Sequence, residues 1–303
     1  MVRLAEGTLA LGEISAKAWE RGLGAVGELL ASVGGVVPVI GIATSAIREA
    51  GNGAAFVEAA RRRWPIDLRI VSGAEEARLA FLGVTTGLGD DPVGVVDLGG
   101  GSAQIAVGIP GGAPRFRTSL PLGVLRLRDR FLGPDARMTE TARQAIVEEV
   151  GRWVGPVAGE VRAIGPRAVH IVSGTARQLG LVAVAFGWSD GVTLTAEVLA
   201  RLSWLLGDLG AGEIETLGVE AGRSDTIATG AVILSTLAAR FDVGEVMLAQ
   251  RGVREGAALD AVRSRPNRVS DTRPAPADAQ SNAATARSGP VASRESRRTV
   301  TMR

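Results

Sequence analysis

The chain has no cysteine and only one histidine, and these scarcities remove several kinds of chemistry. Without cysteine there can be no disulfide framework, no thiol nucleophile and no thiolate metal site. A Ser-His-Asp triad would have to use His170, because the chain offers no other imidazole. Acid–base or metal chemistry must therefore rest on carboxylates, hydroxyls, amides and arginines. Among metal cofactors, this oxygen-rich donor set favours Mg²⁺ or Mn²⁺.

Long apolar runs are also missing. The longest uncharged apolar stretch with a helical pattern lies between Asp225 and Arg240, which is shorter than the ~20 residues that a membrane span needs. The N-terminus has no basic segment followed by an apolar core, so the sequence indicates no signal peptide. We expect a cytoplasmic protein with no membrane partner.

An excess of positive charge is missing outside the C-terminal segment. Residues 263–303 contain nine arginines and three acidic residues, whereas the whole chain has a formal net charge of only +2. This segment is rich in Ser, Ala, Pro and Arg and has few large apolar residues, so we predict a disordered basic tail. It is either a solvated extension or a segment attracted to a polyanion such as polyphosphate, RNA or an acidic membrane. We expect no specific nucleic-acid partner.

The first third of the chain alternates predicted strands with predicted helices. Apolar residues at helical spacing, preceded by Ser15 as a cap, predict a helix over residues 14–31. Strands are predicted over residues 36–43 and 67–71, and helices are expected to begin near Thr44 and Ser72. This pattern indicates an α/β protein, and 303 residues suffice for two domains. We place them at residues 1–123 and 124–262.

A glycine-rich hairpin is the most informative local pattern. An apolar strand ends at Asp97, three glycines and Ser102 follow, and an apolar strand resumes with Ile105 and Val107. Glycines can bring backbone N–H groups close to an anion, so the turn is a candidate phosphate loop. A dinucleotide fingerprint or a P-loop would need a helix directly after the glycines. The alternative is an ordinary turn in which Asp97 bonds its own backbone.

A similar pattern recurs later in the chain. The apolar strand over residues 168–172 leads into Ser173, Gly174 and Thr175, and a helix follows. His170 lies on this strand, so we expect it to be a packed core residue. A last strand within residues 241–250 and a helix ending near Val262 complete two α/β lobes that face a cleft.

Several motifs together resemble the exopolyphosphatase and guanosine pentaphosphate phosphatase (Ppx/GppA) family over residues 1–262. The resemblance implies an α/β fold with duplicated ribonuclease-H-like lobes, as in actin, Hsp70 and the sugar kinases, with phosphate bound between the lobes. The motifs occur in the family's order: Ala43-Thr-Ser-Ala-Ile-Arg-Glu-Ala-Gly-Asn52, Ser72-Gly-Ala-Glu-Glu-Ala-Arg78, Asp97-Leu-Gly-Gly-Gly-Ser102, Ser119-Leu-Pro-Leu-Gly123, Ser173-Gly-Thr175, Arg223-Ser-Asp225 and Arg251-Gly-Val-Arg-Glu-Gly256.

The resemblance also implies residue roles. Glu75 matches the catalytic carboxylate that positions or deprotonates water, and Arg48 matches an arginine that holds phosphate. Each has a simpler interpretation: Glu75 completes a helix capping box with Ser72, and Arg48 is a surface arginine. Asp97 matches the metal-linked carboxylate, with Mg²⁺ or Mn²⁺ as the expected cofactor. The implied phosphate-binding residues are Gly99, Gly100, Gly101, Ser102, Ser173, Gly174 and Thr175.

Three positions depart from the family pattern. Gln104 stands where the family has a glutamate, and an amide is a poorer Mg²⁺ ligand. Ser173 replaces a glycine. Residues 1–7 resemble the third strand of the first lobe, which suggests that the first two strands and the first phosphate loop are missing.

The leading functional hypothesis is a phosphoanhydride hydrolase. It would release terminal phosphate from inorganic polyphosphate, guanosine pentaphosphate or both, by Mg²⁺-assisted attack of water. The alternative is a catalytically impaired phosphate or nucleotide sensor on the same fold, favoured by Gln104 and the missing loop. A sugar or acetate kinase of the same superfamily fits the motifs less well. A homodimer is possible, and the sequence does not choose between the two substrates.

Overall fold

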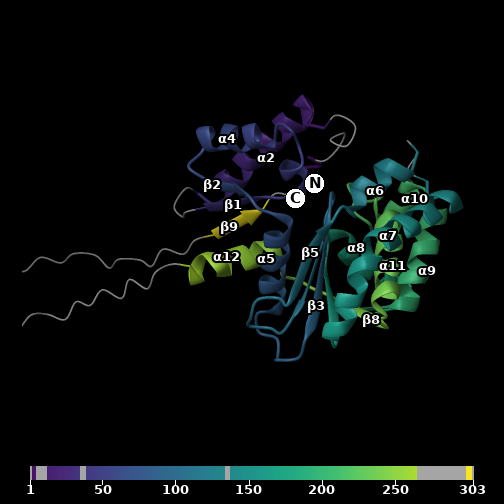
Figure 1. The fold of residues 1–303 in the computed structure, drawn as a ribbon. Helices are drawn as coiled ribbons and strands as arrows, with labels where there is room; N and C mark the ends of the chain where they lie inside the picture. The colour runs from purple at the N-terminus through teal and green to yellow at the C-terminus, as the bar shows by residue number, and fades with distance from the viewer. Residues whose placement is uncertain (1, 5–11, 35–38, 134–136, 265–297, 302–303) are drawn as a thin grey trace, which may run out of the picture.

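The computed structural model describes residues 2–4, 12–34, 39–133, 137–264 and 298–301. Two β-sheets with helices packed against them form an α/β fold, as predicted (Figure 1). None of the described helices is both long and apolar enough to cross a membrane.

The smaller sheet has three parallel strands in the order β2-β1-β9, namely Asp67–Ile70, Val39–Ala43 and Arg298–Thr301. Helices α2 (Ala16–Ser32) and α4 (Gly53–Arg63) lie over it in Figure 1. Ser15 caps α2 by accepting a hydrogen bond from the Ala18 N–H, as its sequence position predicts. The apolar side of α2 packs on α4, with Trp19 edge-on to Phe56, so these helices and the sheet share one core.

The larger sheet has six strands in the order β5-β4-β3-β6-β8-β7. The predicted hairpin is formed by antiparallel β3 (Val93–Leu98) and β4 (Ala103–Gly108), and β3 also pairs in parallel with β6 (Ala168–Val172). All residues of β3 and β4 are buried, which explains their continuous apolar character. The remaining strands are β5 (Phe116–Leu120), β7 (Thr193–Thr195) and β8 (Glu245–Leu248).

One group of helices joins the larger sheet in the largest apolar core (Figure 1). These helices are α6 (Val124–Phe131), α7 (Glu140–Ile164), α8 (Gly174–Ala185), α9 (Ala196–Asp208), α10 (Ala211–Thr216) and α11 (Ile227–Phe241). His170 is buried on β6, and burial without a charged partner lowers its pKa. The expectation that it is a packed core residue is confirmed by this position.

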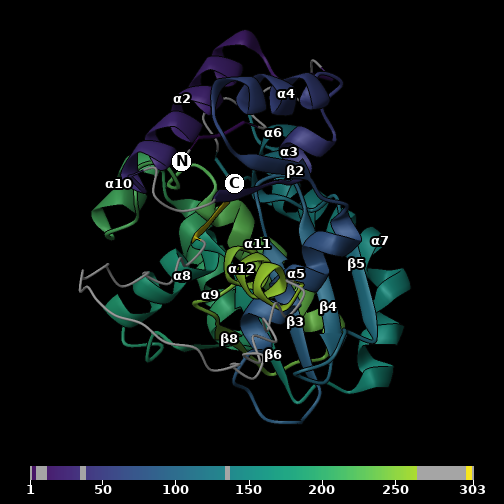
Figure 2. The same cartoon turned by 90° about the vertical axis from the view of Figure 1, so that its left-hand side faces the viewer.

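Helices α5 (Gly73–Thr85) and α12 (Val253–Arg263) lie against each other, and a separate core joins them to both sheets (Figure 2). The helices touch backbone to backbone: a Cβ on Gly256 would lie 1.8 Å from the Leu79 carbonyl oxygen, and one on Gly83 would lie 2.0 Å from that of Gly252. Glycine is therefore required at 83 and 256 by this crossing, whereas a Cβ on Gly252 would lie 2.6 Å from Val172 Cγ1. Because α5 carries Glu75 and Glu76 in its first turn, this crossing also fixes the position of these two carboxylates.

Sheet membership divides the chain at a different place from the expected domain boundary at residue 123. The strands β3, β4 and β5 belong to the larger sheet with β6, so the change of sheet falls between Ile70 and Val93. Sequence alone missed this because the hairpin pairs with β6, some 60 residues further along the chain. The division into domains 1–123 and 124–262 stays a prediction.

Two other expectations need correction. The strand predicted within residues 241–250 is shorter, because α11 extends to Phe241 and ends at Asp242 in the left-handed conformation (φ 59°). In the predicted disordered tail, residues 298–301 form β9, which pairs in parallel with β1. Residues 265–297 lie outside the described part of the chain, as do most of residues 1–7, where a strand was expected.

Candidate functional site

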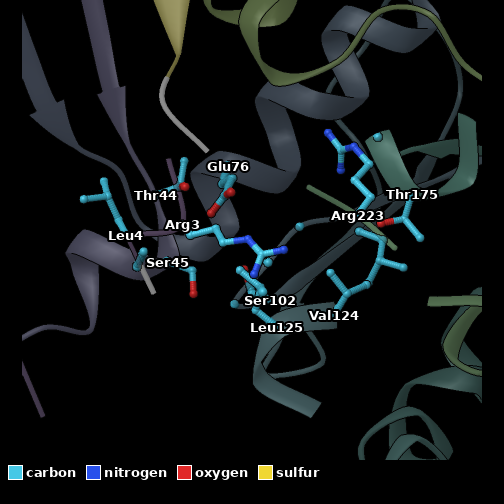
Figure 3. Close-up of a pocket in the computed structure, with 16 residues that line it drawn as sticks. Arg3, Leu4, Thr44, Ser45, Glu76, Ser102, Val124, Leu125, Thr175 and Arg223 are labelled. Atoms are coloured by element: carbon cyan, nitrogen blue, oxygen red, sulfur yellow. The ribbon is translucent and has the colours of Figure 1, made fainter. Parts of the chain in front are cut away.

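A pocket lies where four segments meet: the residues after β1, the start of α5, the β3–β4 loop and the start of α8 (Figure 3). Its lining includes Thr44, Ser45, Glu76, the residues 98–102 and Thr175. Arg3 and Arg223 add positive charge from two more segments. The pocket therefore combines backbone of the candidate phosphate loop with arginines and one carboxylate.

The glycine loop is oriented by α6. The backbone N–H of Val124 donates to the Gly99 carbonyl oxygen (3.0 Å), and those of Leu125 and Arg126 donate to the Gly100 carbonyl oxygen (3.0 and 3.1 Å). These bonds turn the loop carbonyls toward α6. The Gly99 N–H closes the turn by donating to Ser102 O (2.9 Å), whereas no hydrogen bond between described residues uses the Gly100 or Gly101 N–H. Those two N–H groups remain for an anion.

The Ser119–Gly123 motif directly precedes α6 because Gly123 and Arg126 both contact the glycine loop. The Arg126 Nε donates to the Gly101 carbonyl oxygen (2.7 Å), and its guanidinium pairs with Glu49. Glu49 in turn accepts a hydrogen bond from Ser45 Oγ (2.7 Å), which ties the loop to α3 (Ser45–Arg48). A Cβ at Gly123 would lie 2.1 Å from the Gly100 carbonyl oxygen. Only glycine allows this contact between α6 and the loop.

The two adjacent glutamates of α5 point to different places. Glu76 lines the pocket and is only 4% exposed. Glu75, the predicted catalytic residue, does not line it; its carboxylate pairs with Arg78 (2.7 and 2.8 Å), which also donates to Asp260 on α12 (2.8 Å). The Arg78 hydrogen bond lowers the pKa of Glu75. Glu75 therefore stabilises the contact between α5 and α12.

A capping box between Ser72 and Glu75, the simpler interpretation of Glu75, would consist of two reciprocal hydrogen bonds, and the structure contains one of them. Ser72 caps α5 by accepting a hydrogen bond from the Glu75 backbone N–H (3.1 Å). The Glu75 side chain is engaged by Arg78, as described above. Because neighbouring helix positions are separated by about 100°, Glu75 and Glu76 cannot share a face.

Arg48 supports Glu76 and is not among the residues that line the pocket. Its Nη1 lies 2.9 Å from Glu76 Oε2 and donates to the Val71 carbonyl oxygen (3.1 Å). These two contacts hold the Glu76 carboxylate in place at the edge of the pocket. Arg48 is thus next to the pocket, but it binds Glu76, whereas the resemblance implied that it would bind phosphate.

Asp97 and Gln104 lie behind the loop, paired across β3 and β4. Asp97 is 1% exposed and does not line the pocket. The Gln104 side-chain nitrogen donates to Ser102 Oγ (2.7 Å) and Ser119 Oγ (2.9 Å). Among the described residues there is no group of three acidic or histidine side chains able to hold a metal.

The second-lobe loop forms the opposite side of the pocket. Gly174 and Thr175 line it, whereas Ser173 Oγ is used to cap α8 by accepting from the Thr175 N–H (3.1 Å). The Arg223 guanidinium lies on the Gly174 backbone, where a Cβ would be 2.3 Å from Nη2. Glycine at 174 is therefore needed to bring this arginine to the pocket.

Arg3 is a pocket residue that sequence reasoning did not identify. It pairs with Asp225 (2.6 and 2.9 Å), and Asp225 also lies 3.2 Å from Arg128. Sequence gave no signal for Arg3. Glu76 lay inside the recognised motif of residues 72–78, and helical spacing after the Ser72 cap was the signal that could have separated it from Glu75. Arg126 lay outside every recognised motif.

Comparison with known proteins agrees with this architecture. The sequence profile of the Ppx/GppA phosphatase family matches residues 1–265. The chain is 28% identical to exopolyphosphatase 1 of Mycobacterium bovis over 270 residues, which are 85% of this chain and 77% of that protein. It is 30% identical over 276 residues to an uncharacterized protein of Streptomyces coelicolor, covering 88% and 82% of the two chains.

Solved structures show the same fold. The crystal structure of an exopolyphosphatase-like protein superposes with a TM-score of 0.77 at 25% identity, covering 86% of this chain and 87% of the other. An exopolyphosphatase from Cytophaga hutchinsonii gives the same TM-score and coverage at 22% identity. The Aquifex aeolicus member of the Ppx/GppA family gives 0.67 at 23% identity, again covering 86% and 87%. By its sequence, its fold and the motifs gathered at its pocket, this chain belongs to the Ppx/GppA phosphatase family.

Proposed function

We propose that this protein hydrolyses the terminal phosphoanhydride bond of inorganic polyphosphate, with Glu76 as the residue that positions and deprotonates the attacking water. The observation that supports this most directly is the placement of the buried Glu76 carboxylate in the same pocket as the free N–H groups of the glycine loop (Figure 3). Relatives named exopolyphosphatase support the substrate class.

The pocket supplies two features that phosphoryl transfer to water needs. The Gly100 and Gly101 N–H groups and the Arg223 guanidinium can bind the oxygens on which negative charge spreads in the transition state. Glu76 can accept the proton of water, a contribution of about 10²–10⁴-fold in rate for a well-placed base. Arg48, 2.9 Å from the Glu76 carboxylate, fixes its orientation.

A divalent cation fits the donor set. Mg²⁺ or Mn²⁺ is typically bound by one or two carboxylates together with substrate oxygens and water, so the absence of a three-acid cluster among the described residues is compatible with it. Glu76 is the pocket carboxylate that would hold the ion, together with the substrate's own phosphates, whereas the predicted ligand Asp97 lies behind the glycine loop and outside the pocket lining. The ion would neutralise charge on the transferred phosphoryl group.

The test is phosphate release from long-chain polyphosphate with Mg²⁺, comparing the wild type with Glu76→Gln and Glu75→Gln. We expect Glu76→Gln to lower kcat by about 10²-fold or more, while polyphosphate binding measured by fluorescence anisotropy is retained. Glu75→Gln is the matched control, because it removes the same charge from the next residue, and it should retain most of the activity. Equal losses in both variants would contradict the assignment of Glu76.

A phosphate or nucleotide sensor is the second candidate, and Gln104 favours it. The amide donates to Ser102 and Ser119 at a position where the family has a carboxylate. A sensor would bind polyphosphate equally well in the wild type and Glu76→Gln and would release no phosphate in either. Guanosine pentaphosphate, assayed beside polyphosphate, tests the remaining choice of substrate.

A further inference from the structure

A second pocket adjoins the first on the far side of Arg223. It lies between the start of α8, the start of α12 and the residues that follow β8, and it has a volume of about 270 Å³. Gly174 and Arg223 line both pockets, so the two are neighbours that share a wall. The family motifs 173–175 and 251–256 therefore meet at a place that the chemistry proposed above does not use.

Positive charge dominates this second pocket. Three arginines line it, Arg177, Arg223 and Arg254, against the single carboxylate of Glu255. That carboxylate is already used: it accepts a hydrogen bond from the Gly252 N–H at the start of α12 (2.7 Å) and lies 3.9 Å from Arg254 Nε. The lining thus keeps an excess of positive charge after its own acid is counted.

Arg177 and Arg223 differ in how many of their side-chain N–H groups are already used in hydrogen bonds. The Arg177 side chain, exposed at the first turn of α8, makes no hydrogen bond or ion pair with any described residue, whereas its backbone N–H donates to the Ser173 carbonyl oxygen (3.1 Å). Arg223 Nε pairs with Glu220 (3.0 Å), an exposed residue outside the pocket, and its other nitrogens face Gly174. Arginines that retain free donors bind phosphate oxygens well, because the planar guanidinium can donate two parallel hydrogen bonds.

The lining also limits the ligand class. Besides the arginines and Glu255, the pocket is lined by small or polar residues and two valines, with no aromatic ring among them. A base would find no ring to stack on there, whereas a chain of phosphoryl groups needs only positive charge and hydrogen-bond donors. The two pockets in succession therefore match a linear polyanion.

We propose that the second pocket is a distal subsite for inorganic polyphosphate, in which Arg177 and Arg254 bind phosphoryl groups upstream of the one held in the first pocket. Arg223, at the shared wall, contacts the chain where it passes from one pocket to the other. The placement of the terminal phosphate in the first pocket rests on the function proposed above. The binding of a phosphate chain by Arg177 and Arg254 does not.

The test separates the two claims by measuring binding and turnover independently. Binding of fluorescently labelled long-chain polyphosphate is measured in the Glu76→Gln background, with Arg177→Gln, Arg254→Gln and both together. We expect about a tenfold weaker affinity for each lost arginine contact and a weaker dependence of binding on salt concentration. Arg201→Gln is the control, because Arg201 is an exposed helix arginine whose side chain, among the described residues, pairs with Glu197 and lies over Trp188, away from both pockets.

Chain length gives the second readout. In the otherwise wild-type protein, the ratio of KM for long-chain polyphosphate to KM for tripolyphosphate should rise about tenfold in the Arg177→Gln, Arg254→Gln double variant. An unchanged ratio together with unchanged anisotropy would overturn the subsite. If no variant releases phosphate but the affinities still fall as expected, the hydrolase proposal fails while the anion subsite stands.

Discussion

The glycine loop and the start of α5 both contribute to the pocket, but they are held in place by different kinds of contact. The loop is fixed by backbone bonds, since the N–H groups of α6 bind the Gly99 and Gly100 carbonyls. Glu76 is held by a side-chain ion pair with Arg48. Both sets of partners are remote in the chain, 25 residues away for the bond from Arg126 to Gly101 and 28 for the pair of Arg48 with Glu76. The loop, however, is held mainly by backbone groups that many sequences could supply, whereas the glutamate depends on the identity of one side chain.

The strongest test of this difference is Gly123→Ala. The added methyl would meet the Gly100 carbonyl oxygen at 2.1 Å and push the loop away from α6. Overpacking of this kind costs about 1–3 kcal/mol of stability, and a displacement of about 1 Å at a reacting centre can lower the rate about 10²-fold. Thermal unfolding and phosphate release measure the two effects. Gly89→Ala, where a Cβ meets nothing within 4 Å, is the control and should change neither.

The substitution Arg48→Gln tests the second region, the start of α5 with Glu76. Without the ion pair, the Glu76 carboxylate loses one contact that fixes its orientation in the pocket. Because a general base must be placed precisely, we expect kcat for phosphate release to fall about tenfold while KM for polyphosphate changes little. Arg61→Gln, which breaks the exposed pair with Glu58, serves as the comparison. An unchanged kcat would mean that Arg48 does not act through Glu76.

Arg126→Gln removes one of the four hydrogen bonds that hold the loop carbonyls. Because the backbone bonds from α6 remain, the effect should be smaller than that of Gly123→Ala: about 0.5–1.5 kcal/mol for a partly buried hydrogen bond, with a severalfold loss of activity. Glu49→Gln keeps the bond to Gly101, so it should lower activity less. Steady-state kinetics and thermal unfolding of both variants provide the comparison. The reverse order would place the main role of Arg126 in its pair with Glu49.

The smallest expected effect lies outside both regions, at His170. Burial lowers its pKa in the folded protein, so the unfolded chain binds a proton more readily. Stability is therefore highest above the usual pKa of ~6.5 and falls as the pH drops below it, by at most about 1.4 kcal/mol per pH unit. Replacing His170 with leucine should flatten the decrease in melting temperature between pH 7 and pH 5. A decrease of the same slope in both proteins would exclude His170 as its source.

Much of the fold followed from sequence because the signals were local. Ser15 and Ser72 cap the helices that they were predicted to start, and the apolar runs around Asp97 form the predicted hairpin. These features depend on residues within a few positions of one another, so propensity and pattern suffice. The glycine loop and residues 174 and 175, which were expected to face one cleft, line the same pocket.

Sequence by itself determined the elements, the absence of cysteine chemistry, the motif order and the family resemblance that the comparisons confirm. Only the tertiary structure decided which of two adjacent glutamates enters the pocket. Arg78, which also binds Asp260 on α12, forms an ion pair with Glu75 and holds it away from the pocket. It likewise decided that Arg48 binds Glu76 and that the hairpin joins the sheet of β6. In each case the residue or strand that fixes the contact is remote in the chain, or lies equally close in sequence to two possible partners. Packing and charge pairing in the folded protein then determine which contact forms.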